Sequence, residues 1–181
     1  MIKRLFDIFF SILFFIILGW FIVLFLIIVS IDTNSNGFFL QTRIGQYGKP
    51  FTIYKFKTIH PKTQRISKFG AFLRKYKIDE LPQLFNILIG DMSFVGPRPD
   101  IPGYYDKLQG EYRKILELKP GLTSKAAIKY SNEEEILAKQ TNPLQYNDEV
   151  IFPDKVKLNL EYYYKQSFLV DLQIIFKTIF K

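Results

Sequence analysis

Two adjacent carboxylates, Asp79 and Glu80, begin the stretch of this sequence whose residue types are best suited to chemistry. They are expected to open a short apolar segment with helical spacing that ends at Gly90, and a loop then leads to Arg98 between two prolines. A helix N-terminus carries partial positive charge, so we expect Asp79 to stay ionised there. A carboxylate pair followed by an arginine on a stiff turn suits phosphoryl chemistry, in which a metal ion and an arginine neutralise the transferring group.

The same residues also have a purely structural interpretation. Asp is a favoured N-cap residue, and an adjacent Glu complements the helix dipole. An arginine between prolines is equally compatible with an ordinary surface loop. From the local pattern alone, both interpretations stay open.

Length and composition narrow the chemistry further. A chain of 181 residues has room for one modest domain and an appended segment. The absence of cysteine excludes disulfides, Cys-ligated zinc and thiol catalysis. With His60 as the single histidine, a His-based metal site or triad is implausible, whereas hard-cation chemistry through Asp and Glu remains open.

The positive charge is unevenly distributed. The formal net charge is +8, and no Asp or Glu occurs between Thr33 and Ile78. That stretch carries ten basic residues: Arg43, Lys49, Lys55, Lys57, Lys62, Arg65, Lys68, Arg74, Lys75 and Lys77. Such a field attracts phosphates, nucleic acid or an anionic membrane surface. Nucleic acid is disfavoured, because a hydrophobic anchor precedes the basic stretch and no nucleic-acid module is recognisable.

The N-terminal segment is almost wholly apolar from Leu5 to Ile31. Its core of roughly 22 residues, Ile8 to Val29, is long enough to cross a bilayer as one helix. It is too long for a signal-peptide core, and no small-residue cleavage site follows it. Lys3 and Arg4 lie before it and the cationic stretch after it, so the positive-inside rule would place both flanks in the cytoplasm. A single span cannot satisfy that rule.

The remaining patterns predict a mostly helical α+β fold with short strands. Strands are expected at 38–41 (or a helix extension) and 51–56, the second with Lys55 and Lys57 exposed. Helices are expected at 66–77, 100–117, 132–149 (solvated) and 167–181, with a tight loop at 119–123. The apolar stripe of the last helix can lie at a membrane interface or pack in the core.

Four spaced motifs resemble those of the bacterial sugar transferase family, the small monotopic phosphoglycosyl transferases. They are KRLFDIFFSILFF (3–15), YKFKTI (54–59), DELPQLFNILIGDMSFVGPRP (79–99) and KPGLTS (119–124). QTRIG (41–45) also resembles a family segment. The resemblance covers nearly the whole chain in family order and is weakest between Lys125 and Pro153.

The resemblance implies a membrane helix at 1–31 and a catalytic domain at 32–181 with interfacial amphipathic helices. In the family the membrane helix is re-entrant, and its break rests on a Ser-Pro pair where this sequence has Gly19-Trp20. Glycine permits a kink but does not force one, so a spanning helix remains the alternative. The implied location is the bacterial cytoplasmic membrane, with the catalytic domain on the cytoplasmic face.

The activity implied by the resemblance is transfer of a phosphosugar from a UDP-linked sugar to a membrane polyprenyl phosphate, through a covalent aspartyl phosphosugar. Asp79 would be the nucleophile, and Glu80 would bind Mg²⁺. The implied phosphate-binding residues are Arg98, Arg74, Lys57 and Arg43. Asp171 matches a family acidic position, to which we assign a structural role.

Two other classes remain open from the residues alone. A non-catalytic membrane adaptor could use the basic stretch to hold anionic lipid. A metal-dependent phosphohydrolase could act on a lipid diphosphate, although the sparse carboxylates argue against most such sites. The sequence identifies neither the sugar nor the glycan pathway, and it leaves a homodimer possible.

Overall fold

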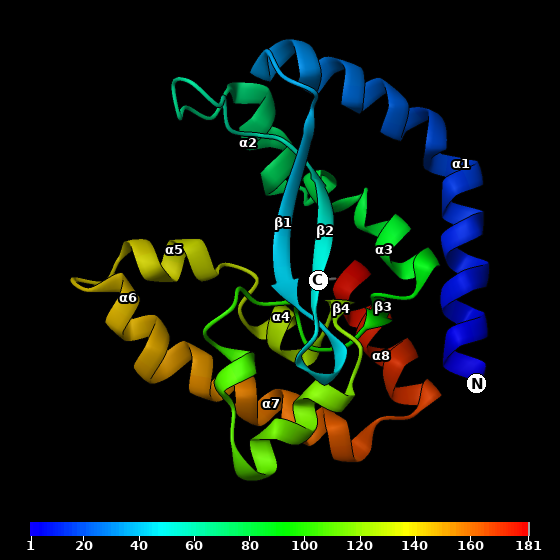
Figure 1. Ribbon diagram of the computed structural model, residues 1–181, viewed down its shortest axis with the longest axis vertical. Coiled ribbons are helices and arrows are strands. Elements are labelled where there is room, and N and C mark those ends of the chain that lie inside the picture. The colour runs from blue at the N-terminus through cyan, green and yellow to red at the C-terminus, as the bar shows by residue number, and fades with distance from the viewer. Residues whose placement is uncertain (181) are drawn as a thin grey trace. The chain divides into compact units, whose positions relative to one another are not determined.

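The computed structural model describes residues 1–180. It contains four short strands and is otherwise mostly helical, which confirms the predicted α+β class. The chain forms two compact units (Figure 1). The first consists of Met1–Arg43 and Phe51–Asp91, and the second of Ile44–Pro50 and the chain from Met92 onward. The predicted division at residue 31 stays a prediction.

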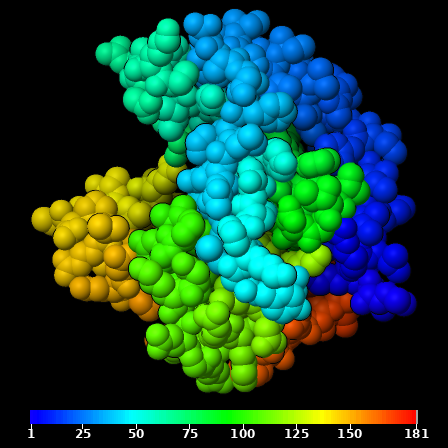
Figure 2. All heavy atoms as spheres, viewed as in Figure 1, coloured from blue at the N-terminus to red at the C-terminus, as the bar shows by residue number. Residues whose placement is uncertain are grey.

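Helix α1 (Ile2–Thr33) is the apolar segment identified from the sequence. Its length and composition would allow it to cross a membrane. The ribbon of α1 bends along its length in Figure 1, and Figure 2 shows its atoms uncovered along the helix. It ends at Asn34, which adopts a left-handed conformation (φ 47°) and donates its backbone N–H to Ile31.

Helix α1 is also part of the first unit's core. Near its C-terminal end, Val29 is buried with Phe56 and Leu73. Near its N-terminus, the Arg4 guanidinium donates hydrogen bonds to the carbonyls of Ile87 (2.6 Å) and Leu88 (2.8 Å). Both ends of the apolar helix are therefore fixed to the same unit.

Strands β1 (Phe38–Ile44) and β2 (Pro50–Phe56) form a two-stranded sheet, joined by the turn Gln46–Gly48. Both expected strands are confirmed. The segment from residue 38 is a strand, not a helix extension, and it continues to Ile44, beyond the expected end at residue 41.

Helix α2 (Lys68–Lys75) is shorter than the expected 66–77. It begins where the Ser67 hydroxyl accepts a hydrogen bond from the backbone N–H of Gly70, a capping interaction that fixes its start.

Helix α3 (Gln83–Ile89) follows the 3₁₀ turn η2 (Ile78–Glu80) and ends at Gly90 with φ 99°, as its glycine predicts. Asn86 is fully buried and ties α3 to β2. Its Oδ1 accepts from the backbone N–H of Tyr54 (3.1 Å), and its Nδ2 donates to the carbonyl of Thr52 (2.7 Å). One side chain therefore satisfies two backbone groups of the strand and positions the helix.

In the second unit, strands β3 (Ser93–Val95) and β4 (Gly121–Thr123) pair in parallel. The sequence predicted a loop where β4 lies. Gly96 and Gly121 allow the two chains to approach closely, since a Cβ added to Gly121 would lie 2.0 Å from the backbone nitrogen of Gly96. Any side chain at that position would force the strands apart.

The helix expected at 100–117 is wrong. The segment contains two 3₁₀ helices, η3 (Tyr105–Lys107) and η4 (Gly110–Glu117), separated by irregular chain. Pro102 lacks a backbone donor, and Gly103 (φ 107°) and Gly110 (φ 57°) adopt left-handed conformations that interrupt an α-helix. The apolar periodicity instead reflects burial of Tyr105, Ile115 and Leu116 in one cluster.

The rest of the second unit is helical. The helices are α4 (Lys125–Lys129), α5 (Glu133–Ala138), α6 (Pro143–Tyr146), the π-helical turn η5 (Asn147–Ile151), α7 (Phe152–Lys165) and α8 (Phe168–Ile179). The expected solvated helix at 132–149 is therefore two short helices and a π-turn. The helix expected at 167–181 is α8, with Asp171 and Ile174 buried.

We expect Asn86→Ala to destabilise the protein, because it removes the partners of the Tyr54 N–H and the Thr52 carbonyl. A buried polar group left without a partner costs about 1–3 kcal/mol. The free energy of unfolding, measured by denaturation in detergent, should fall by at least this amount. Asn132→Ala is the control, since exposed Asn132 makes no side-chain capping bond, and its effect should stay within about 0.5 kcal/mol. Equal small effects would show that Asn86 does not hold α3 to β2.

Candidate active site

The two adjacent carboxylates lie in η2, between α2 and α3. Lys77, just before this turn, has a left-handed backbone (φ 56°), and Pro82 stands at the start of α3. Asp79 and Glu80 therefore lie in a short 3₁₀ turn that comes before the α-helix. The expectation that they open the helix itself is wrong. Pro82 is the N-cap residue of α3 and has no backbone N–H to donate, and the α-helix begins directly after it.

Glu80 is buried and forms an ion pair with Lys55 on β2. Its side chain is 7% exposed, that of Lys55 is 16% exposed, and the distance from Lys55 Nζ to Glu80 Oε1 is 3.0 Å. The expectation that Lys55 lies on an exposed strand face is wrong. A carboxylate removed from water needs a compensating charge, and removing one partner of such a pair is costly. Lys55 supplies that charge and holds the side chain of Glu80, which is next to Asp79 in the sequence.

Asp79 is only partly buried, yet its Oδ1 atom is buried and has no hydrogen-bond partner. Burial raises the pKa of Asp79, and the charge of Glu80 raises it further. The charges of Lys55, Lys77 and Arg74 act in the opposite direction but do not offset these effects. The net direction is opposite to that expected from a helix N-terminus alone, because desolvation and a neighbouring carboxylate outweigh the cationic surroundings.

The other predicted site residues of the first unit come from three elements. Arg74 lies in the last turn of α2, and its charge acts on Asp79. Lys57 follows β2 directly and is half-buried, so the expectation that it is exposed is wrong as well. Its backbone N–H donates to the Gly37 carbonyl. Arg43, at the end of β1, donates from Nη2 to Gln41 Oε1 at 2.6 Å. The phosphate-binding roles of these three residues remain predictions.

Arg98 belongs to the second unit, where backbone hydrogen bonds hold its turn on both sides. The carbonyl of Pro97 accepts from Gly121, and that of Asp100 accepts from Ile44. Arg98 lines a small pocket within this unit, together with Ile44, Gly45, Pro97, Pro99, Tyr105, Ile115, Leu116, Leu118 and Pro120. These bonds fix the backbone of the turn, and the role of the Arg98 guanidinium toward Asp79 stays a prediction.

The donor atoms near Asp79 suit a hard cation only in part. Among residues 1–180, no group of three or more His, Cys, Asp or Glu side chains could hold a metal ion. Mg²⁺, however, commonly binds through one or two carboxylates and completes its shell with water and substrate phosphates. Glu80 and the unpartnered Oδ1 of Asp79 fit that mode of binding.

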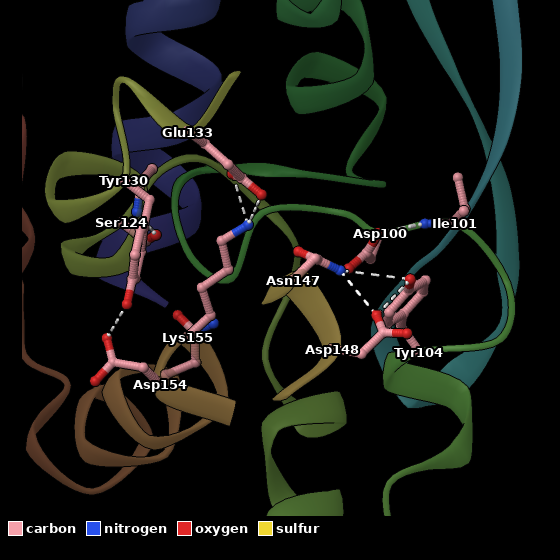
Figure 3. Close-up of polar contacts among 12 residues, drawn as sticks. Asp100, Ile101, Tyr104, Ser124, Tyr130, Glu133, Asn147, Asp148, Asp154 and Lys155 are labelled. Atoms are coloured by element: carbon pink, nitrogen blue, oxygen red, sulfur yellow. Dashed lines mark hydrogen bonds and ion pairs between the residues drawn. The ribbon is translucent and has the colours of Figure 1, made fainter. Parts of the chain in front are cut away.

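A separate polar network in the second unit fixes the segment that resembles the family least. Lys155 Nζ lies 2.7 Å from both carboxylate oxygens of Glu133, and the Tyr130 hydroxyl donates to Asp154 at 2.8 Å (Figure 3). At the other end of the segment, the Tyr104 hydroxyl donates to Asp148 at 2.9 Å. These contacts join α5 and η5 to the rest of the unit. They hold the segment in place, and we assign it no chemical role.

Sequence reasoning missed Lys55 and Asn86. Lys55 is separated by one residue from Lys57, so a strand pattern would place both on one face and does not reveal which of them meets an acid. Asn86 lies in the mostly apolar helical run LPQLFNILI, and a polar residue at a position whose helical spacing predicts burial is the signal that could have identified it.

One unit of the structure thus combines an apolar helix long enough to cross a membrane with a buried carboxylate–lysine pair. The chain belongs to the bacterial sugar transferase family, whose model matches residues 1–181. The family predicted from the four motifs is therefore confirmed.

Relatives of known name agree with this membership. The chain is 34% identical over 190 residues to the uncharacterized sugar transferase EpsL of Bacillus subtilis, covering 99% of this chain and 86% of that protein. It is 38% identical over 122 residues to a putative undecaprenyl-phosphate N-acetylgalactosaminyl 1-phosphate transferase of the same organism, covering 61% and 68%. It is 34% identical over 181 residues to the UDP-glucose:undecaprenyl-phosphate glucose-1-phosphate transferase of Escherichia coli, covering 88% of this chain and 36% of that protein.

The raised pKa of Asp79 gives a pH-dependent prediction for stability. An acid whose pKa is higher in the folded than in the unfolded state binds more protons when folded, so stability falls as pH rises from its unfolded value of 3.8 through its folded pKa. We expect Asp79→Asn to raise the melting temperature at neutral pH. The gain should disappear as pH falls below about 4. A lower melting temperature for the variant at neutral pH would show that the ionised carboxylate is a net stabilising group.

Proposed function

We propose that this protein transfers a sugar 1-phosphate from a UDP-sugar to undecaprenyl phosphate, the reaction named for its E. coli relative. The observation that carries the proposal is the Asp79–Glu80 pair, with Lys55 on Glu80, in a chain that matches the family over its whole length. The donor is a water-soluble anion and the acceptor a lipid-bound anion. A membrane helix in the same unit as a carboxylate pair with basic neighbours would bring these two substrates together at the membrane surface.

In the first step, a carboxylate oxygen of Asp79 attacks the phosphorus that bears the sugar. A bond forms between that oxygen and phosphorus, the phosphoanhydride bond breaks, and its electron pair leaves with UMP. In the second step, a phosphate oxygen of the acceptor attacks the same phosphorus and the Asp79 carboxylate departs. Burial supports the assignment, because a poorly hydrated carboxylate of raised pKa is a better nucleophile once ionised.

The surrounding cations suit the charges of such a reaction. Lys55 holds Glu80, and Arg74 contributes a positive charge that acts on Asp79. Lys57, Arg43 and Arg98 are the further residues that we assign to substrate phosphates, where arginine can bind two oxygens at once. Mg²⁺, held by Glu80, would offset charge on the diphosphate. Each of these groups would act by stabilising charge that develops during transfer.

We further propose that both ends of α1 lie on the cytoplasmic face, so that the helix enters one leaflet and returns. A straight helix of 32 residues is about 48 Å long and could span a bilayer. A spanning orientation would, however, carry Arg4 to the opposite side from α3, whose carbonyls it binds. Buried Asp7 and Ser11, one and two turns further along α1, also favour an N-terminal half that stays on the protein.

The covalent mechanism predicts an enzyme adduct in the absence of acceptor. Purified protein mixed with Mg²⁺ and a panel of UDP-sugars should gain the mass of one phosphosugar, measured by intact-protein mass spectrometry. Polyprenyl phosphate should remove the adduct. Asp79→Asn should form no adduct and should lose roughly 10³-fold or more in turnover, as expected for loss of a nucleophile.

Other results would identify the competing functions. UMP release that requires acceptor but leaves no adduct would indicate direct transfer and would remove the nucleophile role of Asp79. Release of free phosphosugar without acceptor would indicate a hydrolase. If the protein turned over no donor and Asp79→Asn kept its function in the cell, the protein would be a membrane adaptor.

The topology proposal is tested with single cysteines, since the chain has none of its own. Ile2→Cys and Asn36→Cys place thiols at exposed positions beyond the two ends of the apolar core. We expect a membrane-impermeant maleimide to label both in inverted vesicles and neither in intact spheroplasts. Trp20→Cys, at the middle of the helix, is the control and should be labelled in neither. Labelling of the two ends from opposite sides would establish a spanning helix.

A further inference from the structure

A ladder of aromatic rings leads from the membrane helix out along α2. Phe21 and Phe25 of α1 have ring centroids 6.2 Å apart, and Phe25 lies 6.1 Å from Phe69 of α2. The ladder continues from Phe69 to Phe72 (6.4 Å) and from Phe72 to Tyr76 (5.0 Å). The apolar surface of α1 therefore does not stop at the end of that helix but continues onto a second element.

The outer part of this ladder is not covered by the protein. Phe72 is 46% exposed and Tyr76 is 59% exposed, and Ile66, just before α2, is 45% exposed. In Figure 2 the atoms of this region stand beside those of the end of α1, where Ile31 is also exposed. Exposed rings at the end of a membrane helix are typical of the interface between headgroups and acyl chains.

Basic side chains surround the exposed rings. They are Lys62, Arg65, Lys68, Lys75 and Lys77, all of them exposed. Lys75 Nζ lies 5.5 Å from the ring centroid of Tyr76. The carboxylate of Asp32, which faces this region, accepts a hydrogen bond from the Ser67 hydroxyl at the start of α2. The surface thus combines apolar rings with exposed ammonium and guanidinium groups, which suits phosphate groups above an apolar layer.

We propose that α2 and the loop before it, residues 60–77, form a second membrane contact that seats on anionic phospholipid headgroups. The rings of Phe72 and Tyr76 enter the headgroup zone, and the basic residues bind lipid phosphates. This contact holds the η2 turn, which follows α2 directly, at the membrane surface. The inference is independent of which sugar the proposed reaction uses, and its test does not rely on activity.

The test uses a Tyr76→Cys variant of the full chain labelled with an environment-sensitive fluorophore. The protein is reconstituted in nanodiscs of phosphatidylcholine with or without phosphatidylglycerol. A spin label on the lipid headgroup should quench the fluorophore, and quenching should rise by roughly twofold when anionic lipid is present. High salt should reverse the increase, because the attraction is screened over about 10 Å at 0.1 M ionic strength.

Two controls make the result specific. Ala138→Cys carries the same label on α5, whose first turn has three glutamates, and should be quenched little in either bilayer. Replacing Lys62, Arg65 and Lys68 by Gln in the Tyr76→Cys variant should abolish the response to anionic lipid, while α1 keeps the protein in the bilayer. Equal quenching at residues 76 and 138, no response to anionic lipid, or quenching that appears only after polyprenyl phosphate is added would overturn the proposal.

Discussion

Strand β2 connects the anchor, the site and the helix that follows the site within only five residues. Its Thr52 and Tyr54 backbone groups are bound by Asn86 of α3, and Lys55 forms the ion pair with Glu80. Phe56 packs with Val29 of α1. Keeping two adjacent carboxylates partly out of water requires a fixed counter-charge, and this strand supplies it from a position held by hydrogen bonds on one side and apolar packing on the other.

This arrangement gives α1 two roles in one sequence. All of its apolar side chains except Val29 are exposed or half-buried, whereas Val29 belongs to the protein core and Arg4 binds α3. Because Phe56 of the core is next to Lys55 of the site, the packing of the anchor bears directly on the position of Glu80. A soluble domain joined to its anchor by a flexible linker would lack this coupling. Helix α1 and the carboxylate pair therefore belong to one packed unit.

Features that depend on neighbouring residues were predicted correctly from the sequence, whereas features that depend on contacts between distant residues were not. The end of α3 was predictable because glycine is favoured in the left-handed conformation after a helix, and Gly90 adopts it. The pattern at 100–117 misled because burial of Tyr105, Ile115 and Leu116 imitates helical periodicity while Gly103 and Gly110 interrupt the helix. Strand β4 could not be predicted, since three residues become a strand only through pairing with β3.

The sequence by itself determined the long apolar helix, the acid-free cationic stretch, the Asp79–Glu80 pair and the family, since each is a property of consecutive residues or of spaced motifs. Tertiary structure decided which lysine meets Glu80 and in which direction the pKa of Asp79 moves. Both depend on what packs against η2 from β2 and α2. Desolvation and ion pairing are set by neighbours distant in the chain, and a local pattern carries no information about their distances.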